Sequence, residues 1–333
     1  MKFLIIKISA IGDVVMALGM STYIREKYPE ATITWVCGEI VAPLLRATNA
    51  ADQLITVNEQ RIFKGNIIVK ITELLKIWRK IFFRKFDMSC VGYADFRYRF
   101  LALPAIAKTK RNFRHYPNPF PIPGRYHANE YLRLVTGNSN IAAKLPKLTL
   151  ELPASLLALL PQNSQPIVAL VPGGAKNILR ENIIKRWPIE NYVKLAQQLL
   201  TQGYNVILTG GISDLELSQQ FSHLNIIDFI GKTTLLDVIA LCQHCLAIVT
   251  HDTGTLHLAK LTNTHIIALF GPTMPFEFGK IDASDLGIHF LWNGHTLPCC
   301  PCYDGKNYAN CNNNLCMQKI AVNEVLELIS MIN

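Results

Sequence analysis

The 333-residue sequence contains no uninterrupted apolar run of about eighteen residues, the length that a membrane-spanning helix needs, so a membrane span is not expected. It has no G-x-G-x-x-G pattern, which argues against a dinucleotide-dependent oxidoreductase. No D-x-D pair is present to hold a nucleotide-bound Mg²⁺, and no zinc-finger, helix-turn-helix or RNA-binding aromatic signature points to nucleic acid. Charged residues make up only 17% of the chain and hydrophobic residues 50%, which excludes a disordered protein.

The length suits two domains, each large enough to bury its own core. Lys7 and Asp13 interrupt the apolar start of the chain. We therefore interpret residues 2–8 as a strand and not as part of a signal peptide, and we expect a cytoplasmic protein. The parts that we expect are an N-terminal domain at residues 1–155, a C-terminal domain at 165–320 and a C-terminal helix at 321–333.

Apolar runs alternate with segments of helical periodicity in both halves of the chain. This alternation predicts an α/β fold with two parallel sheets, and ligands of such folds bind beyond the carboxyl ends of the strands. The strands that we expect lie at 2–8, 32–37, 53–57, 88–92, 167–171, 205–209, 225–229 and 246–249. The helices that we expect lie at 14–27, 41–46, 70–85, 189–201, 215–222, 235–244 and directly after residue 253. The proline-rich stretch 112–124 is expected to be irregular.

Positive charge is concentrated in the N-terminal half. The chain has a net charge of +9, and residues 61–114 hold fourteen Lys and Arg against three acids. Within them, residues 70–85 combine basic side chains with an apolar stripe at helical spacing, which consists of Ile71, Leu74, Leu75, Ile77, Trp78, Ile81 and Phe82. Basic amphipathic helices with aromatic residues are typical of anionic bilayer surfaces, so we expect membrane-surface association. The alternative is a helix packed on the core with a solvated Lys/Arg face.

Residues 246–260 predict a strand that runs directly into a helix. The turn between them contains Asp252, Thr253 and Gly254. Because the first N–H groups of a helix have no partner and the helix dipole is positive there, such a turn can bind a diphosphate. The alternative is an ordinary turn in which Asp252 or Thr255 is the helix N-cap.

A second strand-to-helix turn lies at residues 7–15 (KISAIGDVV). It places Gly12 and Asp13 where the first strand meets the first helix. Glycine allows a close approach of the backbone to a ligand, and Asp13 is either a helix N-cap or a carboxylate that faces a ligand.

These two turns belong to an ordered set of short motifs. The set consists of KISAIGDVV at 7–15, PGG at 172–174, KRWP at 185–188, TGG at 209–211, DTGTLHLA at 252–259 and LFGPT at 269–273. It resembles glycosyltransferase family nine, the lipopolysaccharide heptosyltransferases and their relatives, from about residue 1 to residue 317. The resemblance implies a GT-B architecture, in which two Rossmann-like domains face each other across a cleft. It also implies that the acceptor binds the N-terminal domain and ADP-heptose the C-terminal one.

The resemblance further implies an inverting transfer, in which an acceptor hydroxyl attacks the anomeric carbon and a nucleoside diphosphate leaves. Asp13 matches the position of the family's base, which takes the proton of that hydroxyl. Lys185 is the expected cation for the departing phosphates, with a solvated lysine before a helix as the alternative. Lys176 and Arg180, in an unusually long stretch between PGG and KRWP, can each take its place. Asp252 is expected to orient the hydroxyls of the donor sugar.

The diphosphate is expected to meet backbone N–H groups of two turns. These groups belong to Gly173 and Gly174 in the first turn and to Thr253 and Gly254 in the second. His257, one helical turn further on, either bonds a phosphate oxygen or is a packed histidine.

The nucleoside and the acceptor have less specific candidates. Asp214 or Glu216, after the TGG turn, is expected to hold the ribose, and the alternative is a pair of solvated acids in the first turn of a helix. Arg97 and Arg99 are expected to contact an anionic acceptor.

The expected reaction requires no metal, although Mg²⁺ is compatible with it. Cysteines crowd the C-terminal end of the chain, where four thiolates could hold zinc: Cys299, Cys302, Cys311 and Cys316. Their spacing departs from paired C-x-x-C motifs, so we expect packed thiols and no zinc.

The activity that we expect is transfer of heptose from ADP-heptose to the inner core of lipopolysaccharide, on an acceptor of the Kdo–lipid A type. The expected place is the cytoplasmic face of the inner membrane, without a nucleic-acid partner. The alternatives are a GT-B enzyme that uses another nucleotide sugar, such as an epimerase, and a non-catalytic nucleotide-sugar-binding protein.

Overall fold

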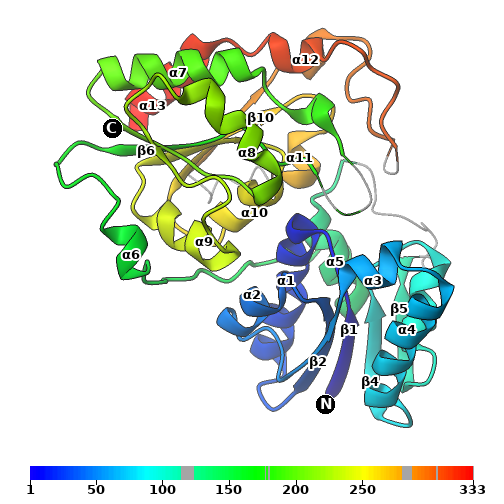
Figure 1. Cartoon of the computed structure of the whole chain (residues 1–333). Helices are drawn as coiled ribbons and strands as arrows, with labels where there is room; N and C mark the ends of the chain where they lie inside the picture. The colour runs from blue at the N-terminus through cyan, green and yellow to red at the C-terminus, as the bar shows by residue number, and fades with distance from the viewer. Residues whose placement is uncertain (114–123, 177, 179–180, 280–286, 305–306, 333) are drawn as a thin grey trace. The chain divides into compact units, whose positions relative to one another are not determined.

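The computed structural model describes residues 1–113, 124–176, 178, 181–279, 287–304 and 307–332 (Figure 1). The chain folds as two compact α/β units, of which the first is Met1–Pro146 and the second contains most residues from Lys147 onward. The predicted α/β class with two parallel sheets is confirmed. Most of the proline-rich stretch 112–124 lies outside the described residues.

The boundary between the units lies earlier than residue 155, where we expected the first domain to end. Residues 147–155 group with the second unit because they bond to it. The backbone N–H of Leu148 donates to the carbonyl oxygen of Leu261 at 2.7 Å. The Lys147 ammonium donates to the carbonyl oxygens of Lys260 and Thr262 at 3.0 and 2.6 Å.

The first unit contains a five-stranded parallel sheet in the order β3-β2-β1-β4-β5. Its strands are β1 (Lys2–Ile6), β2 (Thr32–Gly38), β3 (Gln53–Val57), β4 (Lys85–Val91) and β5 (Ile106–Asn112). The central strand β1 is buried on both faces, which explains its continuous apolar sequence.

Helices pack against this sheet. They are α1 (Ile11–Lys27), α2 (Ala42–Ala47), α3 (Glu59–Lys64), α4 (Ile67–Ile81), α5 (His127–Thr136) and the 3₁₀ helix η1 (Phe96–Ala102). Ile77 and Ile81 of α4 share a core with Leu4 and Ile6 of β1, while α1 and α5 pack against each other. Because Phe3 lies near Tyr28 at the end of α1 and strand side chains alternate, α1 and α4 cover opposite faces (Figure 1).

Helix α4 begins at Ile67 and ends at Ile81, and not at 70 and 85 as predicted. The side chain of Asn66 accepts the backbone N–H of Val69 at 3.0 Å and caps the helix there. In the described part of the chain, no helix is both long and apolar enough to cross a bilayer.

The second unit contains a six-stranded parallel sheet in the order β11-β10-β9-β6-β7-β8. Its strands are β6 (Ile167–Val171), β7 (Asn205–Leu208), β8 (Ile227–Asp228), β9 (Ala247–His251), β10 (His265–Phe270) and β11 (Ile288–Trp292). Val171 pairs with Thr250 in the register of β6 and β9, so the turns that follow these two strands lie side by side at the carboxyl edge of the sheet.

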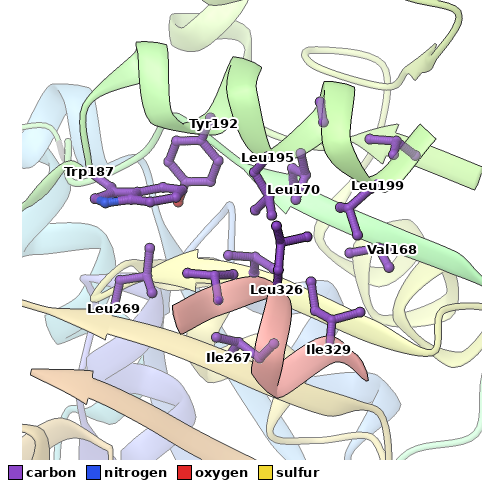
Figure 2. Close-up of a cluster of buried hydrophobic side chains, with 14 of the residues drawn as sticks. Val168, Leu170, Trp187, Tyr192, Leu195, Leu199, Ile267, Leu269, Leu326 and Ile329 are labelled. Carbon is purple, nitrogen blue, oxygen red and sulfur yellow. The ribbon is translucent and has the colours of Figure 1, made fainter. Parts of the chain in front are cut away.

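The helices of the second unit are α6 (Ala154–Leu157), α7 (Ile189–Thr201), α8 (Leu215–Ser218), α9 (Leu235–Gln243), α10 (Gly254–Ala259), α11 (Pro275–Phe278), α12 (Leu315–Gln318) and α13 (Val322–Ile332). Figure 2 shows the core beneath α7 and α13, where side chains of both helices meet those of β6 and β10. Trp187 fixes the start of α7, since its indole N–H donates to the carbonyl oxygen of Ile320 at 3.0 Å.

Candidate functional site

Asp13 lies in the first turn of α1, directly beyond the carboxyl end of β1. The N-cap of this helix is Ala10, so the alternative in which Asp13 is the N-cap is wrong. Its Oδ2 is 3.1 Å from the ammonium of Lys7, and its Oδ1 accepts the hydroxyl of Tyr131 at 3.1 Å. The side chain remains 35% exposed, so these two partners orient the carboxylate without covering it.

Lys7 is buried beneath this carboxylate. Its ammonium lies 4.1 Å from the ring centre of Tyr93 and 5.2 Å from that of Tyr131, which places the charge over two aromatic rings. The hydroxyl of Tyr93 accepts the backbone N–H groups of Ile8 and Ser9 at 2.9 and 3.0 Å. The ring that covers Lys7 is therefore fixed to the same strand-to-helix segment.

The electrostatics of this pair keep both groups charged. Burial tends to raise the pKa of Asp13, but the positive charges of Lys7 and His127 outweigh it and hold that pKa below its usual value. Burial tends to lower the pKa of Lys7, but Asp13 outweighs it and that pKa is raised. Asp13 is therefore an ionised carboxylate at neutral pH and can accept a proton.

The predicted acceptor residues Arg97 and Arg99 lie on η1. Tyr98, between them, stacks on Tyr93 with ring centres 3.6 Å apart. Helix η1 therefore contacts the same tyrosine ring that lies over the Lys7 ammonium. The Arg97 guanidinium bonds both oxygens of Asp95, at 2.9 and 3.1 Å from its Nε, and its side chain is largely exposed. Arg99 is half-buried.

Asp252 directly follows β9 in the second unit, and its buried carboxylate is surrounded by polar partners. Oδ2 lies 2.5 Å from the Lys185 ammonium and accepts the hydroxyl of Thr273 at 2.9 Å. Nε2 of His257 lies 3.8 Å from Oδ1. The structure thus brings together three predicted residues, Lys185, Asp252 and His257.

Charge at this cluster is balanced. Burial opposes ionisation of Asp252, but Lys185 and His257 hold its pKa far below the usual range. The ammonium of Lys185 lies 5.9 and 5.8 Å from the ring centres of Phe278 and Tyr308. Since its charge is already matched by Asp252, a phosphate at Lys185 has to share this cation with the carboxylate.

The glycine turn after β6 is held by Asp214. Its Oδ1 and Oδ2 accept the backbone N–H groups of Gly174 and Gly211, each at 3.0 Å. The Arg186 guanidinium donates to the carbonyl oxygen of Gly174 at 2.8 and 3.0 Å and lies 3.5 Å from Asp214. A side chain at Gly173 would place its Cβ 2.2 Å from Cγ of Asp214, so close packing requires glycine there.

This geometry corrects the expectations for Gly174 and for Asp214. The backbone N–H of Gly174, which was expected to meet the diphosphate, already donates to Asp214. Asp214 is buried and both its carboxylate oxygens bind backbone of its own unit, so it is neither a solvated acid nor an open ribose ligand. Glu216, in α8, is exposed. Of the two candidates, Glu216 is the one whose carboxylate solvent can reach.

The turn before α10 adjoins the glycine turn. A Cβ on Gly174 would lie 3.0 Å from Cγ2 of Thr253, and Gly174 has φ +83°, a conformation that favours glycine. The N-cap position belongs to Thr253, and not to Asp252 or Thr255 as the alternative had it. Gly254 is the first residue of the helix and is half-buried.

Lys176 and Arg180 were the two alternative cations predicted for the phosphates. Lys176 is exposed and its ammonium lies 3.3 Å from Glu181. Arg180 lies outside the described residues.

A family model described as glycosyltransferase family 9 (heptosyltransferase) matches residues 115–308, more than half of the chain. The chain belongs to glycosyltransferase family 9. The predicted resemblance is therefore confirmed, and the chain is a glycosyltransferase.

Curated relatives of this family 9 chain include lipopolysaccharide heptosyltransferase 2 of Escherichia coli K12. It is 25% identical over an alignment of 305 residues, which covers 83% of this chain and 84% of the relative. Lipooligosaccharide heptosyltransferase 2 of Haemophilus influenzae is 36% identical over an alignment of 118 residues, which covers 33% of this chain and 33% of the relative.

Solved structures share the fold. E. coli ADP-heptose lipopolysaccharide heptosyltransferase II superposes with a TM-score of 0.74 at 21% identity, covering 100% of this chain and 98% of that one. An E. coli heptosyltransferase with ADP gives a TM-score of 0.72 at 16% identity, with 100% of both chains covered. The two parallel-sheet units are therefore those of GT-B heptosyltransferases.

The structure adds residues that motifs alone did not assign in this family 9 chain. Thr273, inside the quoted LFGPT motif, bonds Asp252, and Arg186, inside KRWP, bonds Gly174. His251 is fully buried with its Nδ1 3.1 Å from the Tyr192 hydroxyl. Burial and the nearby Arg186 lower the pKa of His251 to about 3, so it stays neutral at physiological pH.

The C-terminal cysteines of the described residues are free thiols. Burial raises the pKa of Cys316, whose thiol forms a hydrogen bond with the thiol of Cys300. Among the described residues, no group of three His, Cys, Asp or Glu side chains is arranged to hold a metal ion. The absence of a cofactor stays a prediction.

Proposed function

We propose that this chain transfers heptose, with inversion, from ADP-heptose to the inner core of lipopolysaccharide, on an acceptor of the Kdo–lipid A type. Membership of family 9 supports glycosyl transfer. The relatives named lipopolysaccharide and lipooligosaccharide heptosyltransferase 2 support heptose as the sugar and the lipopolysaccharide core as the acceptor.

The observation that carries the proposal is the Asp13 carboxylate, ionised by Lys7, oriented by Tyr131 and still open to solvent. In the proposed reaction Asp13 takes the proton of the attacking acceptor hydroxyl as its oxygen bonds the anomeric carbon. The lowered pKa makes Asp13 a weak base, so it acts as the bond forms and not before. Lys7 and Tyr131 keep the carboxylate in one rotamer and one charge state.

On the donor side we assign Lys185 to the leaving diphosphate, with Asp252 as its positioning partner. The ammonium is fixed by Asp252 and by two aromatic rings, so little side-chain entropy remains to be lost when a phosphate binds. The N–H groups of Thr253 and Gly254 are the proposed additional donors to the phosphates. Glu216 is the proposed ribose ligand.

The acceptor determines the proposed location. A lipid-anchored acceptor carries phosphates and acidic sugars, so Arg97 and Arg99 are the proposed cations for it. We propose that the enzyme is cytoplasmic and works at the inner-membrane surface. The reaction as written needs no metal, because cations of the chain and helix N–H groups take the departing charge.

The experiment is ADP release measured with ADP-heptose and Kdo-bearing lipid A. The proposal expects release that requires the acceptor, and much slower release when ADP-glucose or UDP-N-acetylglucosamine replaces the donor. Equal or faster release with another nucleotide sugar would assign the enzyme to that sugar. Binding of ADP-heptose without any release would make the chain a binding protein.

A further inference from the structure

The surface of α4 and of the turn after it carries large apolar side chains that the core does not use. Ile67 and Ile68 are 69% and 68% exposed, and Phe82 and Phe83 are 57% and 70% exposed. Ile71 and Leu75 are also exposed. We call these six residues the apolar face: Ile67, Ile68, Ile71, Leu75, Phe82 and Phe83.

Helix α4 therefore has two apolar sides. Ile77 and Ile81, four residues apart, are fully buried in the core of the first unit. Ile67, Ile71 and Leu75, also spaced by four, form a separate exposed row. The apolar stripe predicted from the sequence is thus divided between the core and the solvent. The exposed row also begins earlier than the predicted stripe, because it includes Ile67 and Ile68.

The backbone conformation at residue 83 indicates that the Phe83 side chain serves the surface of the protein and not its folding. The φ of Phe83, +53°, lies in the left-handed region, where a bulky side chain is disfavoured and glycine is not. The ring centres of Phe83 and Phe82 are 4.2 Å apart, so the two residues form an exposed aromatic pair. The turn between α4 and β4 would form more easily with glycine, and it carries the most exposed of the six apolar residues instead.

Further exposed apolar side chains lie on η1, which is joined to α4. The Trp78 indole N–H donates to the carbonyl oxygen of Phe100 at 2.8 Å and joins η1 to α4. Phe96 and Phe100 are half exposed, as is Leu103 just after them. Exposed apolar side chains that gather on two joined elements are typical of a binding face.

Cations accompany these apolar side chains. Exposed basic residues on α4 and its flanks are Lys64, Lys70, Lys76, Arg79, Lys80 and Lys85. The acid within α4, Glu73, is buried and bonded to Arg61 and Lys76, so it adds no exposed negative charge. Exposed apolar side chains and exposed Lys and Arg on one helix and its flanks match an anionic lipid surface, which has acyl chains beneath phosphates.

We propose that the apolar face inserts into the interfacial layer of an anionic bilayer, with these cations on the phosphates. The purpose of such docking rests on the proposed lipid-linked acceptor. Insertion and electrostatic attraction differ in their response to salt. At about 1 M salt the Debye length is about 3 Å, so binding by charge alone is lost, whereas the binding energy from buried apolar area remains.

The test is sedimentation of the full chain with vesicles of phosphatidylethanolamine and phosphatidylglycerol, without either substrate. We compare wild type with the double variant Phe82→Ser, Phe83→Gly, whose glycine suits the left-handed backbone. We expect the variant to bind about tenfold to a hundredfold more weakly. The matched control is Leu159→Ser, Met331→Ser, which removes two exposed apolar residues elsewhere and is expected to bind like wild type.

Salt and a soluble acceptor separate the outcomes. Wild type should keep part of its vesicle binding at about 1 M salt, and the Phe82, Phe83 variant none. On a delipidated, water-soluble acceptor, wild type and the Phe82, Phe83 variant should release ADP at the same rate. Failed docking is therefore distinguishable from failed catalysis. Unchanged vesicle binding of the variant overturns the proposal. So does a dimer in solution that the same variant dissociates, since a second copy would then cover the face.

Discussion

Replacing Lys7 by methionine tests what holds Asp13 ionised. Two unit charges 3.1 Å apart interact by about 1 kcal/mol in water and by about 5 kcal/mol at an effective dielectric of 20. Because the Asp13 side chain is 35% exposed, the lower part of this range applies, about 1–3 kcal/mol. At about 1.4 kcal/mol per pH unit, the acid limb of the pH–rate profile should move up by about one to two units.

The sign of the effect on stability follows from the same pair. The lowered pKa of Asp13 contributes stability above the ordinary Asp pKa, and this contribution is lost as pH falls through the folded-state pKa. The raised pKa of Lys7 contributes stability below the ordinary Lys pKa, and this contribution is lost as pH rises through the folded-state pKa. Lys7→Met should therefore cost stability across the neutral range, with a smaller cost at both extremes.

The assay is kcat for ADP release from pH 4 to 9, with urea unfolding beside it. Lys108→Met is the matched control, because Lys108 forms an exposed ion pair with Asp87 at 2.7 Å, away from Asp13. An unmoved acid limb in Lys7→Met, with activity lost equally at every pH, would refute the view that Lys7 acts through the charge of Asp13.

Three further outcomes follow from the second unit. Lys185→Met should raise KM for the donor about tenfold or more, since a charged phosphate contact is removed, and steady-state kinetics at fixed acceptor measures this. Asp214→Ala should lower the free energy of unfolding by about 2–4 kcal/mol in urea denaturation, because it leaves Gly174, Gly211 and Arg186 without their carboxylate. The His251 imidazole should show no titration between pH 5 and 8 by NMR, as its lowered pKa of about 3 requires.

The sheet strands and long helices could be predicted from the sequence because they follow strong periodic patterns. Residues 53–57, 167–171 and 189–201 were predicted as elements with the bounds that the structure gives. Other elements were missed. β5 alternates exposed and half-buried positions with Lys and Arg, and α3 depends on the Asn58 cap. The buried apolar strand β10 was missed as well, because residues 269 and 270 were assigned only to the LFGPT motif.

The site could be predicted only to the level of motifs. Asp13 and Asp252 stood out because each lies in a strand-to-helix turn and in a motif of the resembled family. The structure adds that each carboxylate forms an ion pair with a buried or largely buried lysine. The role of Asp214 could not be predicted, because its partners lie 3 and 40 residues away and their contacts depend on the sheet register. Sequence periodicity likewise gave one apolar stripe on α4, since it cannot divide a helix surface between a core and a solvent-facing side.

The central claim is that Asp13 removes the proton of the acceptor hydroxyl, and Asp13→Asn tests it most directly. Binding of ADP-heptose by calorimetry and ADP release with Kdo-bearing lipid A are measured on the same preparation. We predict an unchanged donor Kd with turnover lower by about 10²–10⁴-fold, the usual contribution of a general base. Turnover within about twofold of wild type, or loss of donor affinity in parallel with turnover, would contradict the account.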